Sequence, residues 1–253
     1  MIFKTFILIA SVMLGAMAAN WFRSGSKLRL KIMLSFSGAY LLALAMMHLL
    51  PEIYGQEPTH HHHDHDHGGH AHNYDLIPGL LVMLGFLFQV ILEMVSHGVE
   101  HGHAHRELKR PKHNIPIAAM LSLCLHAFIE SIPIGTQINN PGVTDKLFWG
   151  IALHHIPVGI VLFSLLRERK LKLPTTYGLL LLFAIMAPLG MITGEFLPEI
   201  NKINVYATAF VAGIFLHIST TILFESSEDH RFNIIKIVSV IAAIVVAWVF
   251  SSF

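Results

Sequence analysis

Two apolar stretches in the middle of the chain carry side chains that a lipid-spanning helix normally lacks. They read LSLCLHAFIESIPIG (residues 121–135) and GIALHHIPVGIVLF (residues 150–163). The first stretch places His126 and Glu130 four residues apart, on one face of a helix. An ionisable group inside a bilayer costs several kcal/mol unless it faces a partner, a cavity or an ion. Because imidazole and carboxylate groups are ligands of divalent metals, we predict a metal site between these two stretches.

The second stretch adds the adjacent His154 and His155, followed by Pro157. Taken alone, the histidine–glutamate pair of the first stretch could be a hydrogen-bonded contact that only holds two helices together. Three or four ligands at a similar depth favour a metal site instead. Pro157 and Pro133 each remove a backbone hydrogen bond, so we expect kinked helices that line a cavity.

The composition is that of a membrane protein. Hydrophobic residues make up 54% of the chain and charged residues only 13%, which is too apolar for an ordinary soluble domain. The net charge of +1 is spread over short loops, so no nucleic-acid partner is expected. The single cysteine, Cys124, excludes an internal disulfide framework, and we expect it to be a buried, inert thiol.

Hydropathy divides the chain into eight segments close to the roughly 20 residues that cross a bilayer. We predict an all-α integral membrane protein whose helices span approximately residues 2–19, 32–52, 76–97, 115–138, 147–166, 175–197, 205–225 and 234–253. The first segment resembles a signal sequence, but the basic residues that follow it favour an uncleaved span. We therefore expect one transmembrane domain over residues 1–253.

The basic residues predict the orientation. The loops after the first, third, fifth and seventh spans hold 14 Lys and Arg residues, whereas the opposite side holds only Lys4, Lys146 and Lys202. We predict that the four basic loops are cytoplasmic and that both termini are extracellular or periplasmic. The chain would then be a multi-pass protein of the cell membrane, the inner membrane in a Gram-negative bacterium.

Two loops are rich in histidine. The predicted external loop, about residues 55–75, holds eight histidines with Asp64 and Asp66, and the predicted cytoplasmic loop, about residues 98–114, holds several more. Imidazoles at this density bind divalent metals loosely. Either loop could capture or buffer ions, and the alternative is a solvated low-complexity segment without a role.

Further His and Glu side chains lie in or near the ends of other spans. They could be ligands along an ion pathway or ordinary interfacial residues, and sequence alone leaves both open. They are His48, Glu52, Glu93, His97, Glu195, His217 and Glu225.

The chain resembles the ZIP (Zrt/Irt-like) family of divalent-metal transporters, through segments HLLPE, HAFIES, ALHHIPVG, APLGMITG and AGIFLHISTTILFE (residues 48–52, 126–131, 152–159, 187–194 and 212–225). The resemblance implies uptake of Zn²⁺, or of Fe²⁺, Mn²⁺ or Cd²⁺, into the cytoplasm. It also implies an inverted repeat of spans one to three and six to eight around spans four and five, alternating access and a homodimer.

The chain departs from the family pattern within the two central motifs. The departures are Ala127, Ser131, His155 and Val158, and the last removes a carboxylate that bridges two metals in many family members. We therefore predict a reduced site formed by His126, Glu130 and His154, with His155 nearby as a further candidate ligand, and the sequence leaves one ion or two open. A residue of the second span, or Glu195, could complete it.

The main alternative is a membrane-embedded metalloenzyme of the histidine-box type, similar to a di-iron hydroxylase. The spacing of His97 and His101 and the pair His154–His155 favour it, but His126 and Glu130 lie within a span and not at the membrane surface. We expect a transporter and no enzyme, with the bilayer and the transported ion as partners and no cofactor.

Overall fold

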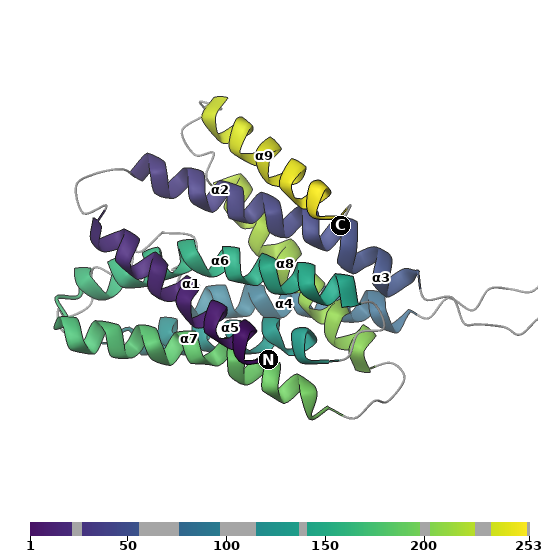
Figure 1. Ribbon diagram of the computed structural model, residues 1–253, viewed down its shortest axis with the longest axis horizontal. Coiled ribbons are helices and arrows are strands. Elements are labelled where there is room, and N and C mark those ends of the chain that lie inside the picture. The colour runs from purple at the N-terminus through teal and green to yellow at the C-terminus, as the bar shows by residue number, and fades with distance from the viewer. Residues whose placement is uncertain are drawn as a thin grey trace, which may run out of the picture.

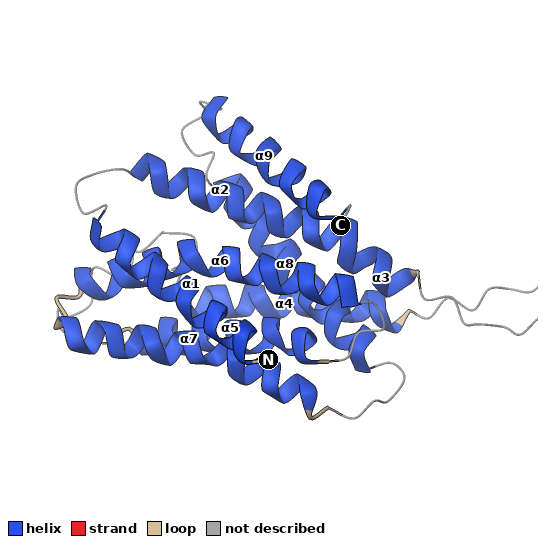
Figure 2. Cartoon of the chain, in the orientation of Figure 1, coloured by secondary structure: helices blue, strands red, loops and turns tan. Residues whose placement is uncertain are grey.

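The computed structural model describes residues 1–21, 27–55, 76–96, 115–136, 141–197, 203–225 and 234–251. In these ranges the chain forms helices and no strand (Figures 1 and 2). The helices are α1 (Ile2–Trp21), α2 (Lys27–Leu44), the π-helix η1 (Ala45–Leu49), α3 (Leu50–Tyr54), α4 (Ile77–Ser96), α5 (Ile117–Gly135), α6 (Pro141–Glu168), α7 (Leu173–Glu195), α8 (Ile203–Glu225) and α9 (Ile234–Ser251).

Seven helical segments of the described chain are long and apolar enough to cross a membrane. One of them, Arg29–Tyr54, runs through α2, η1 and α3. The eighth predicted span corresponds to α9, whose apolar stretch Lys236–Val249 is shorter than the other seven. The segments otherwise follow the predicted spans, except that α2 begins at Lys27 and α6 at Pro141, five and six residues earlier than expected.

One helix irregularity lies away from the prolines of the two central motifs. Pro133 and Pro157 lie inside α5 and α6, which stay helical through both residues, and the kinks expected there stay a prediction. The irregularity is η1, which ends two residues before Pro51. Proline cannot donate a hydrogen bond to the preceding turn, and a wider π turn accommodates that loss.

Glycines allow three pairs of helices to pack backbone against backbone. A Cβ at Gly15 of α1 would collide with the α6 backbone, and one at Gly85 would collide with α8. Gly190 and Gly194 of α7 lie in the same way against the α5 backbone. Small residues at such positions are typical of membrane helix interfaces, because they let two helices approach closely.

These pairs divide the bundle into two sets of helices. In the first set α1 packs on α6 and α7, and α7 packs on α5; in the second set α2 packs on α8 and α9, and α8 packs on α4 (Figure 1). The two sets meet mainly where α2 contacts α6 and where α4 and α8 contact α5. The backbone contacts of the glycines all lie within one set or the other.

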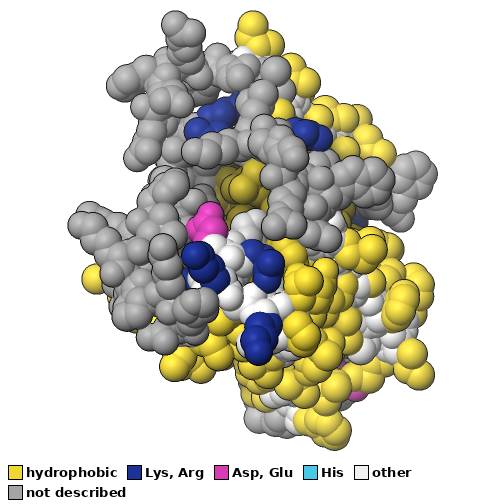
Figure 3. Space-filling view, turned by 90° about the vertical axis from the view of Figure 1, so that its left-hand side faces the viewer, with side chains coloured by type: hydrophobic (Ala, Val, Ile, Leu, Met, Phe, Trp, Pro, Cys, Tyr) yellow, Lys and Arg dark blue, Asp and Glu magenta, His cyan; other side chains and the backbone are white. Residues whose placement is uncertain are grey.

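The outer surface of the bundle is apolar along its length and basic at one end. Large apolar side chains point outward from α4 and α9, as expected for helices that face lipid. Figure 3 shows Lys and Arg side chains gathered at the end that forms the left-hand side of Figure 1. The start of α2 and the junction between α6 and α7 contribute Arg29, Lys31, Arg167, Lys170 and Lys172.

Candidate metal centre

The cluster of predicted ligands lies at the middle of two long helices. His126 is nine residues from either end of α5, and His154 is thirteen and fourteen residues from the two ends of α6. At a rise of 1.5 Å per residue, each imidazole is more than about 13 Å from its helix ends. His126, Glu130 and His154 are all buried. If the two helices cross the bilayer, these side chains lie near its midplane.

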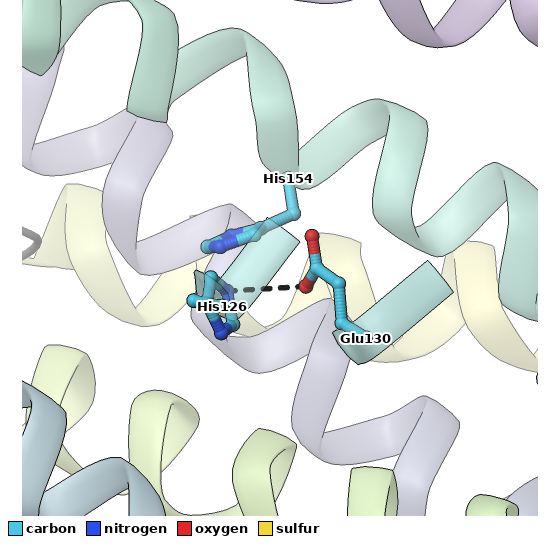
Figure 4. A group of neighbouring side chains, drawn as sticks. All are labelled: His126, Glu130 and His154. Atoms are coloured by element: carbon cyan, nitrogen blue, oxygen red, sulfur yellow. Dashed lines mark ion pairs between the residues drawn. The ribbon is translucent and has the colours of Figure 1, made fainter. Parts of the chain in front are cut away.

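The structure brings these three side chains together (Figure 4). One potential ligand atom from each of His126, Glu130 and His154 lies within 4.8 Å of the other two, and this is the one such group of three in the described residues. His126 and Glu130 are one turn apart on α5, with Nε2 3.1 Å from Oε2. His154 reaches the same place from α6, and its ring meets that of His126 edge to face.

His155 contacts the same carboxylate from the other side. Its Nε2 lies 2.7 Å from Oε1 of Glu130, and both side chains are almost completely buried. The two oxygens of Glu130 are therefore shared between imidazoles of two helices. His155, which was predicted as a fourth candidate ligand beside the other three, is outside the group of three. Its ring also packs against Phe183 of α7.

Ser37 of α2, which was not among the predicted site residues, also contacts the cluster. Ser37 of α2 has its Oγ 3.0 Å from Nδ1 of His154, and both side chains are buried. Ser37 belongs to the second set of helices, whereas the three clustered residues belong to the first set. The hydrogen bond therefore crosses the boundary between the two sets.

The donor set suits a first-row divalent cation. Two imidazoles and one carboxylate are ligands that zinc accepts, and three protein ligands leave one tetrahedral position open for water or exchange. The group contains no thiolate, since the single cysteine, Cys124, is partly buried among apolar side chains. A mixed nitrogen and oxygen set also accepts iron, manganese or cadmium, so the ligands alone do not select one metal.

Two of the secondary candidates form a pair of their own, away from this cluster. His217 of α8 lies with Nε2 2.6 Å from Oε2 of Glu93 on α4, and Phe86 packs edge to face on the imidazole. The two side chains position each other through this contact. His217 and Glu93 therefore link α8 to α4, and neither belongs to the group of three.

The other secondary candidates are dispersed. His48 lies in the π-helix η1, Glu52 in the short α3 that follows it, and Glu195 is exposed at the end of α7. None of them joins the group of three. His97, both histidine-rich loops and the side chain of Glu225 lie outside the described residues.

Comparison with known proteins agrees with this arrangement. The sequence profile of the family described as ZIP Zinc transporter matches residues 1–117 and 103–247. The chain belongs to the ZIP zinc transporter family. The predicted resemblance is thus confirmed over almost the whole chain. Members of the ZIP family are transporters and not enzymes, so the histidine-box metalloenzyme is not supported.

Individual ZIP proteins show a more distant similarity. The chain is 29% identical over 167 residues to Zinc transporter ZIP9 of Micropogonias undulatus, a match that covers 60% of this chain and 53% of the relative. It is 30% identical over 165 residues to Zinc transporter ZIP9-A of Xenopus laevis, covering 60% and 54%. Zinc transporter ZIP9 of Xenopus tropicalis is similar to the same degree. The chain spans about half the length of the curated relatives it matches.

Proposed function

We propose that this protein carries zinc, or a related divalent cation, across a membrane through the cluster of His126, Glu130 and His154. One observation carries the proposal: three buried ligating atoms from two apolar helices lie within 4.8 Å of one another. Buried ionisable groups at membrane depth are costly, and binding a cation is the role that uses all three. The printed names of the relatives, which are zinc transporters, support zinc as the cargo.

We also propose that the cluster holds one ion at a time. His155 Nε2 occupies Oε1 of Glu130 at 2.7 Å, so Oε2 is the oxygen left to face an ion beside His126. Val158, one turn beyond His154, offers no further carboxylate. A second cation next to the first would need an anionic bridge that these residues do not supply.

We propose the membrane topology and the direction of transport together, because both follow from the position of the basic residues. The basic end seen in Figure 3 would face the cytoplasm, with α9 as an eighth span and both termini outside. Ions would then enter from the extracellular or periplasmic side and leave into the cytoplasm. An inverted repeat of α1–α4 and α7–α9 around α5 and α6, alternating access and a homodimer remain expectations that follow from the ZIP family.

The proposal is tested with purified protein in liposomes that contain a fluorescent zinc indicator. We expect saturable zinc uptake by the unmodified chain, and a loss of at least 90% of the initial rate in His126→Ala. His217→Ala is the matched control, because it removes a buried imidazole that also contacts a glutamate but lies outside the cluster. Unchanged uptake by His126→Ala, at equal incorporation into the liposomes, would refute the assignment.

Binding is measured separately from flux. Zinc should raise the melting temperature of the unmodified protein, since a ligand that binds only the folded state stabilises it. That rise should disappear in His126→Ala while the metal-free melting temperature stays within a few degrees. The number of bound ions is measured by elemental analysis of zinc-equilibrated protein that lacks residues 56–75 and 97–114, so that the histidine-rich loops do not add to the count. We expect one ion per chain, and two ions per chain would refute the single-ion proposal.

A further inference from the structure

We infer that Ser37 is the positioning residue of the proposed ion site, because it sets which nitrogen of His154 is offered to the cation. This inference rests on the proposed function, and it assigns a role to a residue on a helix that carries none of the three ligands. The contact that supports it joins Oγ of Ser37 to Nδ1 of His154 at 3.0 Å. Ser37 is 3% exposed and His154 is 4% exposed, so water does not compete for either group.

The chemistry of imidazole gives the contact its consequence. A neutral imidazole has one N–H and one nitrogen with a free lone pair, and only the latter binds a metal. When Nδ1–H donates to Oγ of Ser37, Nε2 has the lone pair and faces no competing proton. Ligating histidines generally donate their other N–H to an oxygen, which fixes both the tautomer and the ring orientation. The hydroxyl oxygen of Ser37 can accept this N–H, and a cation that takes the lone pair of Nε2 then leaves the proton on Nδ1.

The packing around the contact shows that α2 is built to approach α6 at this point. Gly150 lies one turn before His154 on the same face of α6. A Cβ at Gly150 would lie 2.6 Å from a methyl carbon of Leu44 and 3.3 Å from the ring of Tyr40, both on α2. Without a side chain at Gly150 the two helices come close, and Ser37 reaches His154 two turns away from Leu44.

A neighbouring residue supplies a matched control. Ser35 is on the same helix and only 1% exposed, but its Oγ has no hydrogen-bond partner among the described residues. Ser35→Ala and Ser37→Ala therefore remove the same atom from the same helix at the same degree of burial. They differ in whether that atom contacts a proposed ligand.

The experiment compares zinc affinity and uptake in full-length protein. We expect Ser37→Ala to weaken zinc binding by about 10- to 100-fold, the usual effect of removing the partner of a ligating histidine, and to raise the KM of uptake by a similar factor. Ser35→Ala should leave both values unchanged, and Ser37→Thr should restore them, because threonine keeps the hydroxyl. Affinity is measured by competition with a zinc indicator on the same full-length proteins, in which the histidine-rich loops contribute equally to every variant.

A second readout separates positioning from packing. In protein with ¹⁵N-labelled histidine and bound zinc, the His154 signals should report a protonated Nδ1 and a metal-bound Nε2. If Ser37→Ala does not yield folded protein, Ser37→Thr and Ser37→Val provide the same comparison, since they have nearly the same shape and differ in the hydroxyl.

The possible failures are distinguishable. If the unmodified protein binds and transports zinc but Ser37→Ala, or Ser37→Val relative to Ser37→Thr, has unchanged affinity, the role of Ser37 is wrong and the proposed function stands. Zinc bound through Nδ1 of His154 would also overturn it. If the unmodified protein neither binds nor transports a divalent metal, the proposed function fails and this inference fails with it.

Discussion

Replacing Glu130 by glutamine tests the central electrostatic requirement of the cluster. Glutamine has nearly the same size and shape, so the change removes the negative charge while it preserves the packing of a completely buried side chain. The carboxylate lies within 4.8 Å of the ligand atoms of His126 and His154, so a cation among them would be at a comparable distance or less. A divalent cation and a carboxylate 4 Å apart attract by about 8 kcal/mol at an effective dielectric constant of 20, and if desolvation of the ion offsets roughly half, about 4 kcal/mol is left.

This energy corresponds to about three orders of magnitude in affinity, because each 1.4 kcal/mol is a factor of ten. We therefore expect Glu130→Gln to raise the Kd for zinc roughly 1,000-fold and to abolish uptake at micromolar zinc. The Kd is measured by indicator competition on purified protein that lacks the histidine-rich loops. Glu195→Gln is the control, because Glu195 is exposed and outside the cluster.

A Kd for Glu130→Gln within tenfold of the unmodified value would refute this reasoning. It would mean that the carboxylate serves only to hold the two imidazoles in place. Loss of the folded protein would be separated from loss of binding by the metal-free melting temperature. Glu130→Asp adds a second comparison, since it keeps the charge but withdraws it by one methylene group, and we expect an intermediate Kd.

Two further predictions concern the packing of the helices. Gly190→Ala should lower the melting temperature, because its Cβ would meet the carbonyl of Phe128 and such overpacking lowers the free energy of unfolding by about 1–3 kcal/mol. Gly178→Ala should leave the free energy of unfolding unchanged or raise it by up to about 1 kcal/mol, since a Cβ there meets nothing within 4 Å. Equal melting temperatures of these two variants in detergent would contradict the proposed backbone contact. Lys4→Ala should lower the free energy of unfolding by no more than about 1 kcal/mol, because the ion pair of Lys4 with Asp145, at 2.7 Å, is partly solvent-exposed. A larger loss of stability in the same melting assay would show that this ion pair fixes α1 on α6.

The spans and the three clustered residues could be predicted because each leaves a strong local pattern. An apolar run of about 20 residues identifies a membrane helix by length alone, and an ionisable residue inside such a run is conspicuous. The early start of α6 was missed because Asp145 and Lys146 make its first turns polar. The π turn at Ala45–Leu49 adds one residue to a helical turn, and this insertion does not alter the apolar pattern from which the span was predicted.

The contacts between distant segments could not be predicted, and Ser37 illustrates the reason. A serine in a membrane helix commonly bonds to a carbonyl of its own helix, as Ser11 does to Leu8 and Ser164 to Ile160. Nothing in the sequence around Ser37 distinguishes it from these. The partner that changes its role is 117 residues away, and only the packing of α2 on α6 reveals it.

The boundary between the two sets of helices has a consequence for how tightly the cluster can hold an ion. The three proposed ligands are on α5 and α6, which belong to one set, while Ser37 is on α2 in the other set. Sliding one set past the other by a single helical turn, 5.4 Å, would remove the hydroxyl from His154 and leave the ligands themselves together. One site could thus have a high affinity in one arrangement of the bundle and a lower affinity in another, so that an ion captured from dilute solution is still able to leave.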